Sequence, residues 1–147
     1  MTITNSISQS AVLAYSVESG NPQVLLVTSR GRGRWVLPKG HIDAGKNSRE
    51  AALCEAYEEA GIRGHLAETK IGTYFYSKAD EKDGHIYRVK VYPMQVSTLA
   101  DDWPEKNQRD RIWMDFPDAS QAVEEPELQN LLRDFGEMLS ALYFQKA

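Results

Sequence analysis

Three glutamates lie within five residues of one another, at Glu55, Glu58 and Glu59. In an α-helix the spacing i, i+3, i+4 makes these positions neighbours, so three carboxylates would share one side of the helix. Such crowded charges repel, and a divalent cation such as Mg²⁺ would remove the repulsion and also carry substrate phosphates. A carboxylate flanked by others also has the raised proton affinity that a general base needs. The alternative is a solvated acidic face without a ligand.

The surroundings of the glutamates favour a binding site over a solvated face. The preceding loop, residues 38–45, is rich in glycine and carries Lys39 and His41, so it suits close backbone approach to a ligand. Ala51 and Ala52 lie one turn earlier on the acidic side, and we expect these small residues to leave room for a ligand.

A helix over residues 48–60 is predicted to carry the three carboxylates. Asn47 is a suitable N-cap with Glu50 three residues later, as in a capping box, and Gly61 suits the C′ position. Glutamates and apolar residues fall on opposite sides of this helix. The residues predicted to pack against a sheet are Leu53, Ala56, Tyr57 and Ala60.

The remaining chain predicts a sheet and a C-terminal helix. Short β-branched, aliphatic or aromatic runs predict strands. These strands are at 11–17, 23–29, 35–37, 71–76, 86–96 and 111–114. The turn cluster 19–22 predicts a hairpin or tight loop between the first two, and 78–84 is a polar loop. A C-terminal helix is predicted from Pro126. Its apolar residues recur at helical spacing, which indicates packing. They are Leu128, Leu131, Leu132, Phe135, Met138, Leu139 and Leu142.

Composition bounds the class of protein. With 147 residues, 41% hydrophobic and 26% charged, the chain fits a single globular domain over residues 1–147. The net charge of −4 argues against broad nucleic-acid binding, and no run of about 18 apolar residues predicts a membrane span. Cys54 is the single cysteine and is interpreted as a small buried thiol. With no secretory leader visible, we expect a cytoplasmic protein; the oligomeric state stays open.

The segment 34–64 resembles the Nudix signature: Gly, five residues, Glu, seven residues, then Arg-Glu-apolar-x-Glu-Glu-x-Gly-apolar. Several positions match in register. They are Gly40, Glu55, Ala56, Glu58, Glu59, Gly61 and Ile62. Two depart from it, because Lys46 stands where the first Glu belongs and Cys54 where the Arg belongs. In the family that Arg helps to orient the metal-binding carboxylates and the first Glu supports it, so we expect slowed rather than abolished activity.

The run Leu-Pro-Lys-Gly-His at 37–41 is similar to the Nudix branch that hydrolyses diadenosine polyphosphates and diphosphoinositol polyphosphates, and 102–105 and 111–113 are loosely similar. The resemblance implies an α/β fold with a mixed β-sheet sandwiched between α-helices. It also implies Mg²⁺ or Mn²⁺ as cofactor. Implied metal ligands are Glu55, Glu58, Glu59 and the Lys39 carbonyl, with Glu55 and Glu58 as catalytic residues. Glu58 is a ligand or the base, and some family members use a base from a later loop. The candidates for that base are Asp101, Asp102 and Glu105.

Cationic and aromatic side chains are candidates for binding the substrate, against the alternatives of solvated surface charge and core packing. The polar candidates are Arg30, Arg32, Arg34, Lys39, His41, Arg88 and Lys90, with Arg109 and Arg111 in the same class. The aromatic candidates are Tyr74, Phe75, Tyr76 and Tyr87.

The function implied is metal-dependent hydrolysis of a phosphoanhydride bond in a nucleoside-diphosphate-linked or polyphosphate substrate. The favoured substrate is a dinucleoside polyphosphate or diphosphoinositol polyphosphate, so the partner is a small anionic phosphorylated molecule and not a membrane. Alternatives are a house-cleaning nucleoside triphosphate pyrophosphatase and an RNA 5′ pyrophosphohydrolase. From another class, a non-catalytic Nudix ligand-binding module is supported by Lys46 and Cys54.

Overall fold

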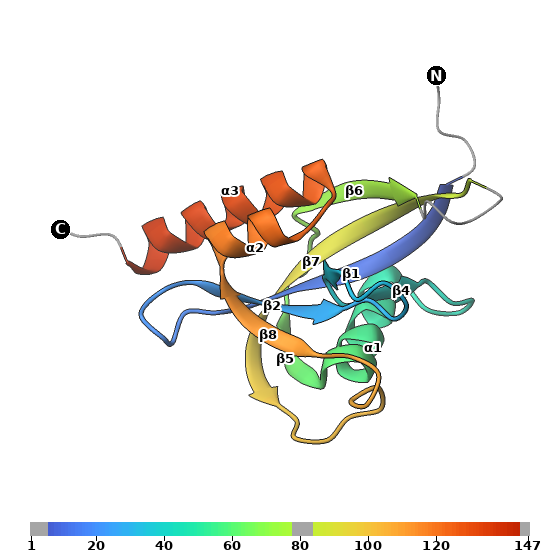
Figure 1. Ribbon diagram of the computed structural model, residues 1–147, viewed down its shortest axis with the longest axis horizontal. Coiled ribbons are helices and arrows are strands. Elements are labelled where there is room, and N and C mark those ends of the chain that lie inside the picture. Colours follow the sequence, from blue (N-terminus) through green and yellow to red (C-terminus); the bar gives the residue numbers. More distant parts are fainter. Residues whose placement is uncertain (1–5, 78–83, 145–147) are drawn as a thin grey trace.

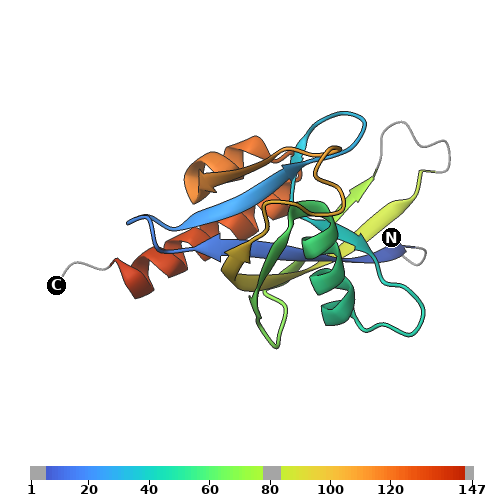
Figure 2. The ribbon, with the colours of Figure 1, turned by 90° about the horizontal axis from the view of Figure 1, so that it is seen from below.

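A computed structural model describes residues 6–77 and 84–144 (Figure 1). A mixed sheet forms the centre, with one helix on one face and two helices on the other (Figures 1 and 2). This arrangement confirms the predicted α/β sandwich. No helix within the described ranges is long and apolar enough to cross a membrane.

The strand order along the main sheet is β3-β2-β1-β7-β5, with β4 paired to β1, β6 to β7 and β8 to β2. The strands are β1 Ser6–Ser16, β2 Gln23–Thr28, β3 Trp35–Val36, β4 Lys39–His41, β5 Ile62–Leu66, β6 Gly72–Ser77, β7 Ile86–Leu99 and β8 Arg111–Asp115. The long strands β1 and β7 run parallel, and the other described pairs are antiparallel. The β1–β2 hairpin confirms the turn predicted at 19–22.

The helices are α1 Ser48–Ala60, α2 Phe116–Ala122 and α3 Pro126–Tyr143. Both ends of α1 are as predicted. The Glu50 N–H donates to Asn47 Oδ1 over 2.8 Å, the Asn47 amide donates back to the Glu50 carboxylate over 2.7 Å, and Gly61 has φ 66°.

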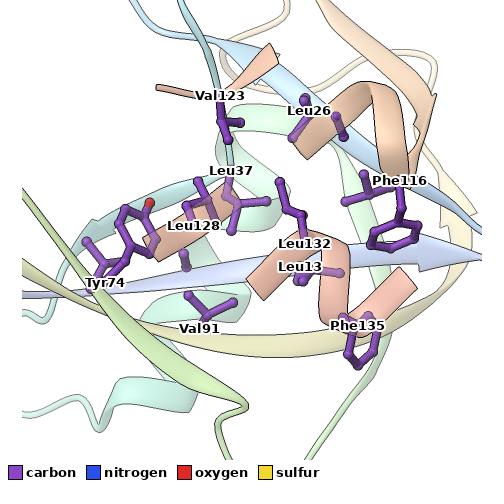
Figure 3. Close-up of a cluster of buried hydrophobic side chains, with 14 of the residues drawn as sticks. Leu13, Leu26, Leu37, Tyr74, Val91, Phe116, Val123, Leu128, Leu132 and Phe135 are labelled. Atoms are coloured by element: carbon purple, nitrogen blue, oxygen red, sulfur yellow. The ribbon is translucent and has the colours of Figure 1, made fainter. Parts of the chain in front are cut away.

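Two hydrophobic clusters hold the layers together. Beneath α2 and α3, Leu13 and Leu26 of the sheet meet Leu128, Leu132 and Phe135 (Figure 3). On the other face, α1 packs through alanines onto strand residues. This second cluster includes Ala52, Ala56, Ala60, Val12, Leu25, Val27 and Met94. The packing stripe of α3 is confirmed except at its end, where Met138 and Leu142 are 45% and 69% exposed.

The packing face of α1 differs from the prediction. Leu53 is 39% exposed, and Tyr57 is half-buried with the Arg63 guanidinium 4.1 Å from its ring centre. Ala51 and Ala52 are 2% and 0% exposed and belong to the interior. The expectation that they leave room for a ligand was wrong, because small side chains here let the helix approach the sheet closely.

Several short elements were not predicted. Residues 39–41 of the expected loop form β4, paired with residues 9–11 of β1. Strand β5 and helix α2 were also missed, and β1 and β7 extend beyond their predicted ends. The predicted loop 78–84 lies outside the described residues except for Gly84.

Candidate active site

A pocket of about 450 Å³ opens where α1, β4, the β2–β3 connection and the β7–β8 connection meet. It joins the three glutamates to residues from distant parts of the chain. Its lining consists of Gln9, Ser29, Arg30, Arg34, Lys39, Gly40, His41, Asp43, Glu55, Glu58, Glu59, Tyr76, Glu105 and Arg109.

Glu59 is the most buried of the three carboxylates, at 5% exposure. Its Oε1 accepts the Lys39 N–H over 3.3 Å, and its Oε2 lies 3.5 Å from Arg109 Nη2. Burial, opposed by the nearby Arg109 and Lys39 cations, raises the pKa of Glu59 to about 8. Burial also raises the pKa of Glu55, which hydrogen-bonds Glu59. The helical pattern placed Glu59 opposite the apolar residues of α1, but the structure buries its carboxylate, so Glu59 does not lie on a solvated face.

Gly40 explains how Glu55 reaches the strand. A Cβ placed on Gly40 would lie 2.6 Å from Glu55 Cγ and closer still to the carboxyl group. Only a residue without a side chain lets this carboxylate lie against β4.

The Glu55–Glu59 pair fits a hard divalent cation. Two adjacent carboxylates need either a shared proton or a cation, and their oxygens are the donors that Mg²⁺ and Mn²⁺ prefer. No group of three His, Cys, Asp or Glu side chains in the described part of the chain forms a complete cage. An ion held by Glu55 and Glu59 would therefore complete its shell with backbone, water or phosphate oxygens. The Lys39 carbonyl stays a prediction for one of these; the structure shows its N–H at Glu59.

Glu58 is connected to the two positions that depart from the Nudix signature. The Cys54 thiol lies 3.5 Å from Glu58 Oε1, and Lys46 Nζ donates to Cys54 Sγ over 3.6 Å. The side chains at positions 46 and 54 therefore contact each other. The cationic side chain lies at position 46, whereas the Nudix signature has its arginine at position 54. Cys54 is half-buried, so the interpretation as a small buried thiol was wrong, and Lys46 is a basic neighbour that the sequence did not reveal.

Among the predicted cations, Arg30, Arg34, Lys39 and Arg109 line the pocket together with His41. Arg34 is committed to protein partners, with Nη1 3.2 Å from Glu124 and 3.1 Å from Glu125. Arg30 donates to Gln108 over 2.9 Å. The Lys39 ammonium lies 5.1 Å from the centre of the Tyr76 ring, and burial lowers the pKa of Lys39 to about 8.

Arg32, Arg88 and Lys90 do not line this pocket. Arg32 is exposed, and Arg88 donates to Ser8 Oγ over 3.2 Å. The structure therefore does not bring these three residues to the carboxylates, and a role in substrate binding stays a prediction. Arg111 instead donates to the Ala60 and Ala100 carbonyls, over 2.7 Å each.

Tyr76 is the one predicted aromatic in the lining. Its ring stacks on Tyr87 at 4.9 Å and 14°, and its hydroxyl donates to Gln9 Oε1 over 2.8 Å. Tyr74 is 1% exposed and belongs to the core, and Phe75 is half-buried outside the lining.

Glu105 is the loop base candidate that lines the pocket; Asp101 and Asp102 do not. Glu105 accepts from Arg109 Nε over 2.6 Å, an i, i+4 spacing visible in the sequence. Gln9, Ser29 and Asp43 were missed, and no sequence signal distinguishes them.

Comparison with known proteins identifies the family. A model of the NUDIX domain matches residues 8–135. Nudix hydrolase 12, mitochondrial, of Arabidopsis thaliana is 32% identical over 117 residues, covering 77% of this chain and 58% of that protein. Diphosphoinositol polyphosphate phosphohydrolase 3-beta of Homo sapiens is 30% identical over 118 residues, covering 79% and 68%. A crystal structure of C. elegans Ap4A hydrolase superimposes with a TM-score of 0.73 at 27% identity, covering 91% of this chain and 98% of the other.

The chain spans 58% of the length of the first two curated relatives and 66% of the third. Those relatives carry mitochondrial and chloroplastic names, so a cytoplasmic location stays a prediction. The match over residues 8–135 covers most of the chain, and its fold neighbours have the same architecture. The chain belongs to the Nudix family.

Proposed function

We propose that this chain is a hydrolase that uses Mg²⁺ or Mn²⁺ to cleave a phosphoanhydride bond. The observation that carries the proposal is the buried Glu59 carboxylate beside Glu55, with Glu55 resting on the bare backbone of Gly40. Placing the buried Glu59 carboxyl group beside the half-buried Glu55 costs free energy that the Lys39 N–H and Arg109 offset only for Glu59, and a cation shared by both groups would stabilise the pair.

In this proposal Glu55 and Glu59 hold the cation, and Glu58 is either a further ligand or the base that accepts a proton from water. When bound, the cation would neutralise charge on the diphosphate and orient the attacking water in line with the leaving group. Glu105 is the second candidate for the base, but its oxygen is already engaged by Arg109. Within the described residues, the Glu58 carboxylate is engaged only by the weaker Cys54 thiol, which favours Glu58 as the base.

Lys39, Arg30 and His41 are proposed to contact the phosphates. All three line the pocket, and Lys39 and Arg30 are not paired with a carboxylate by a direct salt bridge in the described residues. A cation that is not already neutralised gains more from a phosphate than Arg34, which is held by two glutamates.

The proposed substrate is a dinucleoside polyphosphate, with a diphosphoinositol polyphosphate second. Support for the first is the fold neighbour named Ap4A hydrolase, which this chain covers almost completely. Support for the second is the human relative named for diphosphoinositol polyphosphates. Hydrolysis of nucleoside triphosphates or RNA 5′ ends remains an alternative within the same chemistry.

A substrate panel tests the proposal. The purified chain is assayed with Mg²⁺ and with Mn²⁺ on diadenosine tetraphosphate, a diphosphoinositol phosphate, a nucleoside triphosphate and a 5′-triphosphorylated RNA, with products separated by chromatography. The proposal expects the highest kcat/KM on diadenosine tetraphosphate. Calorimetric binding of a ligand with no turnover of any of the four would instead support a non-catalytic Nudix module.

A further inference from the structure

Arg109 is held at the pocket wall by two hydrogen bonds and by an ion pair with Glu59. It comes from the connection between β7 and β8, and its side chain is 9% exposed. Its Nε donates to Glu105 Oε1 over 2.6 Å, and its Nη1 donates to the Thr28 carbonyl at the end of β2 over 3.0 Å. The remaining Nη2 lies 3.5 Å from Glu59 Oε2.

The Glu59 carboxylate is therefore contacted from two sides. Its Oε1 accepts the Lys39 N–H of β4 over 3.3 Å, and its Oε2 faces Arg109. Each carboxylate oxygen has two lone-pair directions, so these contacts fix the orientation of the group and leave lone pairs for a metal.

Arg109 contacts a candidate metal ligand in a chain that lacks the signature arginine at position 54. The Nudix signature places an arginine there that helps to orient the carboxylates, but this chain has Cys54, whose thiol contacts Glu58 and not Glu59. Within the described residues, the arginine that reaches Glu59 is Arg109, which lies 50 positions after Glu59 in the sequence.

We infer that Arg109 is a positioning residue that orients Glu59 for metal binding, in place of the arginine that the signature carries at position 54. The inference rests on the proposed function, because it needs Glu59 to be a metal ligand. Loss of a residue that orients a metal ligand typically changes metal affinity or activity about 10–100-fold.

The local charge is compatible with this role. When Glu59 is ionised, as metal binding requires, Arg109 contributes one positive charge, and its two carboxylate partners, Glu59 and Glu105, contribute two negative charges. The group keeps a net negative charge, so a divalent cation is still attracted to Glu59.

Binding of Mn²⁺ without substrate tests the inference, since it separates orientation of Glu59 from contact with a phosphate. Free Mn²⁺ is measured by electron paramagnetic resonance for the wild type, Arg109→Gln, Glu59→Gln and the double variant. Arg133→Gln is the matched control, because Arg133 is an exposed arginine of α3 outside the pocket lining.

Arg109→Gln is expected to weaken Mn²⁺ binding by about tenfold or more, and Arg133→Gln to leave it unchanged. The double variant is expected to bind no more weakly than Glu59→Gln, because two residues that act through one contact are not additive. Wild-type or tighter Mn²⁺ binding by Arg109→Gln overturns the inference, and a raised KM with unchanged Mn²⁺ binding would assign Arg109 to the substrate.

Arg109→Lys covers the case in which Arg109→Gln does not fold. Lysine keeps the charge but cannot make both hydrogen bonds and the ion pair with Glu59 in the same fork geometry, so it is expected to weaken Mn²⁺ binding by at least about threefold. Wild-type affinity in a folded Arg109→Lys overturns the inference. If Glu59→Gln binds Mn²⁺ as the wild type does, the metal assignment of the proposed function fails first, and the role of Arg109 fails with it.

Discussion

Replacing Gly40 with alanine should disable the site while leaving the fold intact. The added Cβ would lie 2.6 Å from Glu55 Cγ, whereas ordinary contact begins at 3.4 Å, so Glu55 must move by about 0.8 Å or more. Glu55 is a flexible side chain and Gly40 is not in a positive-φ conformation, so the displacement should cost only about 0.5–1.5 kcal/mol of stability. A misplacement near 1 Å in a catalytic group can cost about 10²-fold in rate, and we expect kcat to fall by about that factor.

The assay is hydrolysis of diadenosine tetraphosphate at saturating Mg²⁺, with unfolding in urea measured on the same samples. Gly72→Ala is the control, because its Cβ would lie 2.6 Å from Leu131 Cδ2, a smaller clash of the same kind with a flexible side chain outside the pocket lining. It should lower stability by no more than Gly40→Ala does and keep the rate. A Gly40→Ala variant with wild-type kcat would refute the reasoning, because Glu55 would then not need its place against β4.

Three further predictions follow from the same contacts. Arg34→Ala leaves the buried Glu125 without its cation, so the free energy of unfolding in urea should fall by about 2 kcal/mol, allowing for the part-exposed pair; a loss under about 0.5 kcal/mol would mean the pair contributes nothing. Cys54→Arg with Lys46→Glu should raise kcat or Mg²⁺ affinity by restoring the signature; lower activity would mean that the Lys46–Cys54–Glu58 contacts already orient the carboxylates. Diadenosine tetraphosphate should be hydrolysed with at least about tenfold higher kcat/KM than ADP-ribose, and salt should erode that preference; a salt-independent preference for ADP-ribose would contradict it.

The sequence was informative where local rules decide the structure. Both ends of α1 followed from Asn47, Glu50 and Gly61, because caps depend on residues within one turn. The glutamates and Gly40, which the sequence brought together by their spacing, line one pocket in the structure.

The sequence failed where burial and pairing depend on distant segments. The helical pattern could not show that the alanines bring α1 so close to the sheet that Glu59 is buried. The pairing of Arg34 with Glu125 joins residues 91 positions apart, so the sequence offered Arg34 as a phosphate-binding candidate without revealing its protein partner. Strand β4 was missed because its pairing with β1 is set by tertiary contact, not by its glycine-containing sequence.

The most direct test of the metal site is hydrolysis by protein freed of metal with a chelator and titrated with Mg²⁺, for the wild type and Glu59→Gln. A catalytic metal lowers the activation free energy by several kcal/mol, and each 1.36 kcal/mol corresponds to a tenfold change in rate. We therefore predict no turnover without metal, recovery on addition of Mg²⁺, and a loss of more than about 10²-fold in the rate of Glu59→Gln. Undiminished turnover by the metal-free protein, or a wild-type rate in Glu59→Gln, would contradict it.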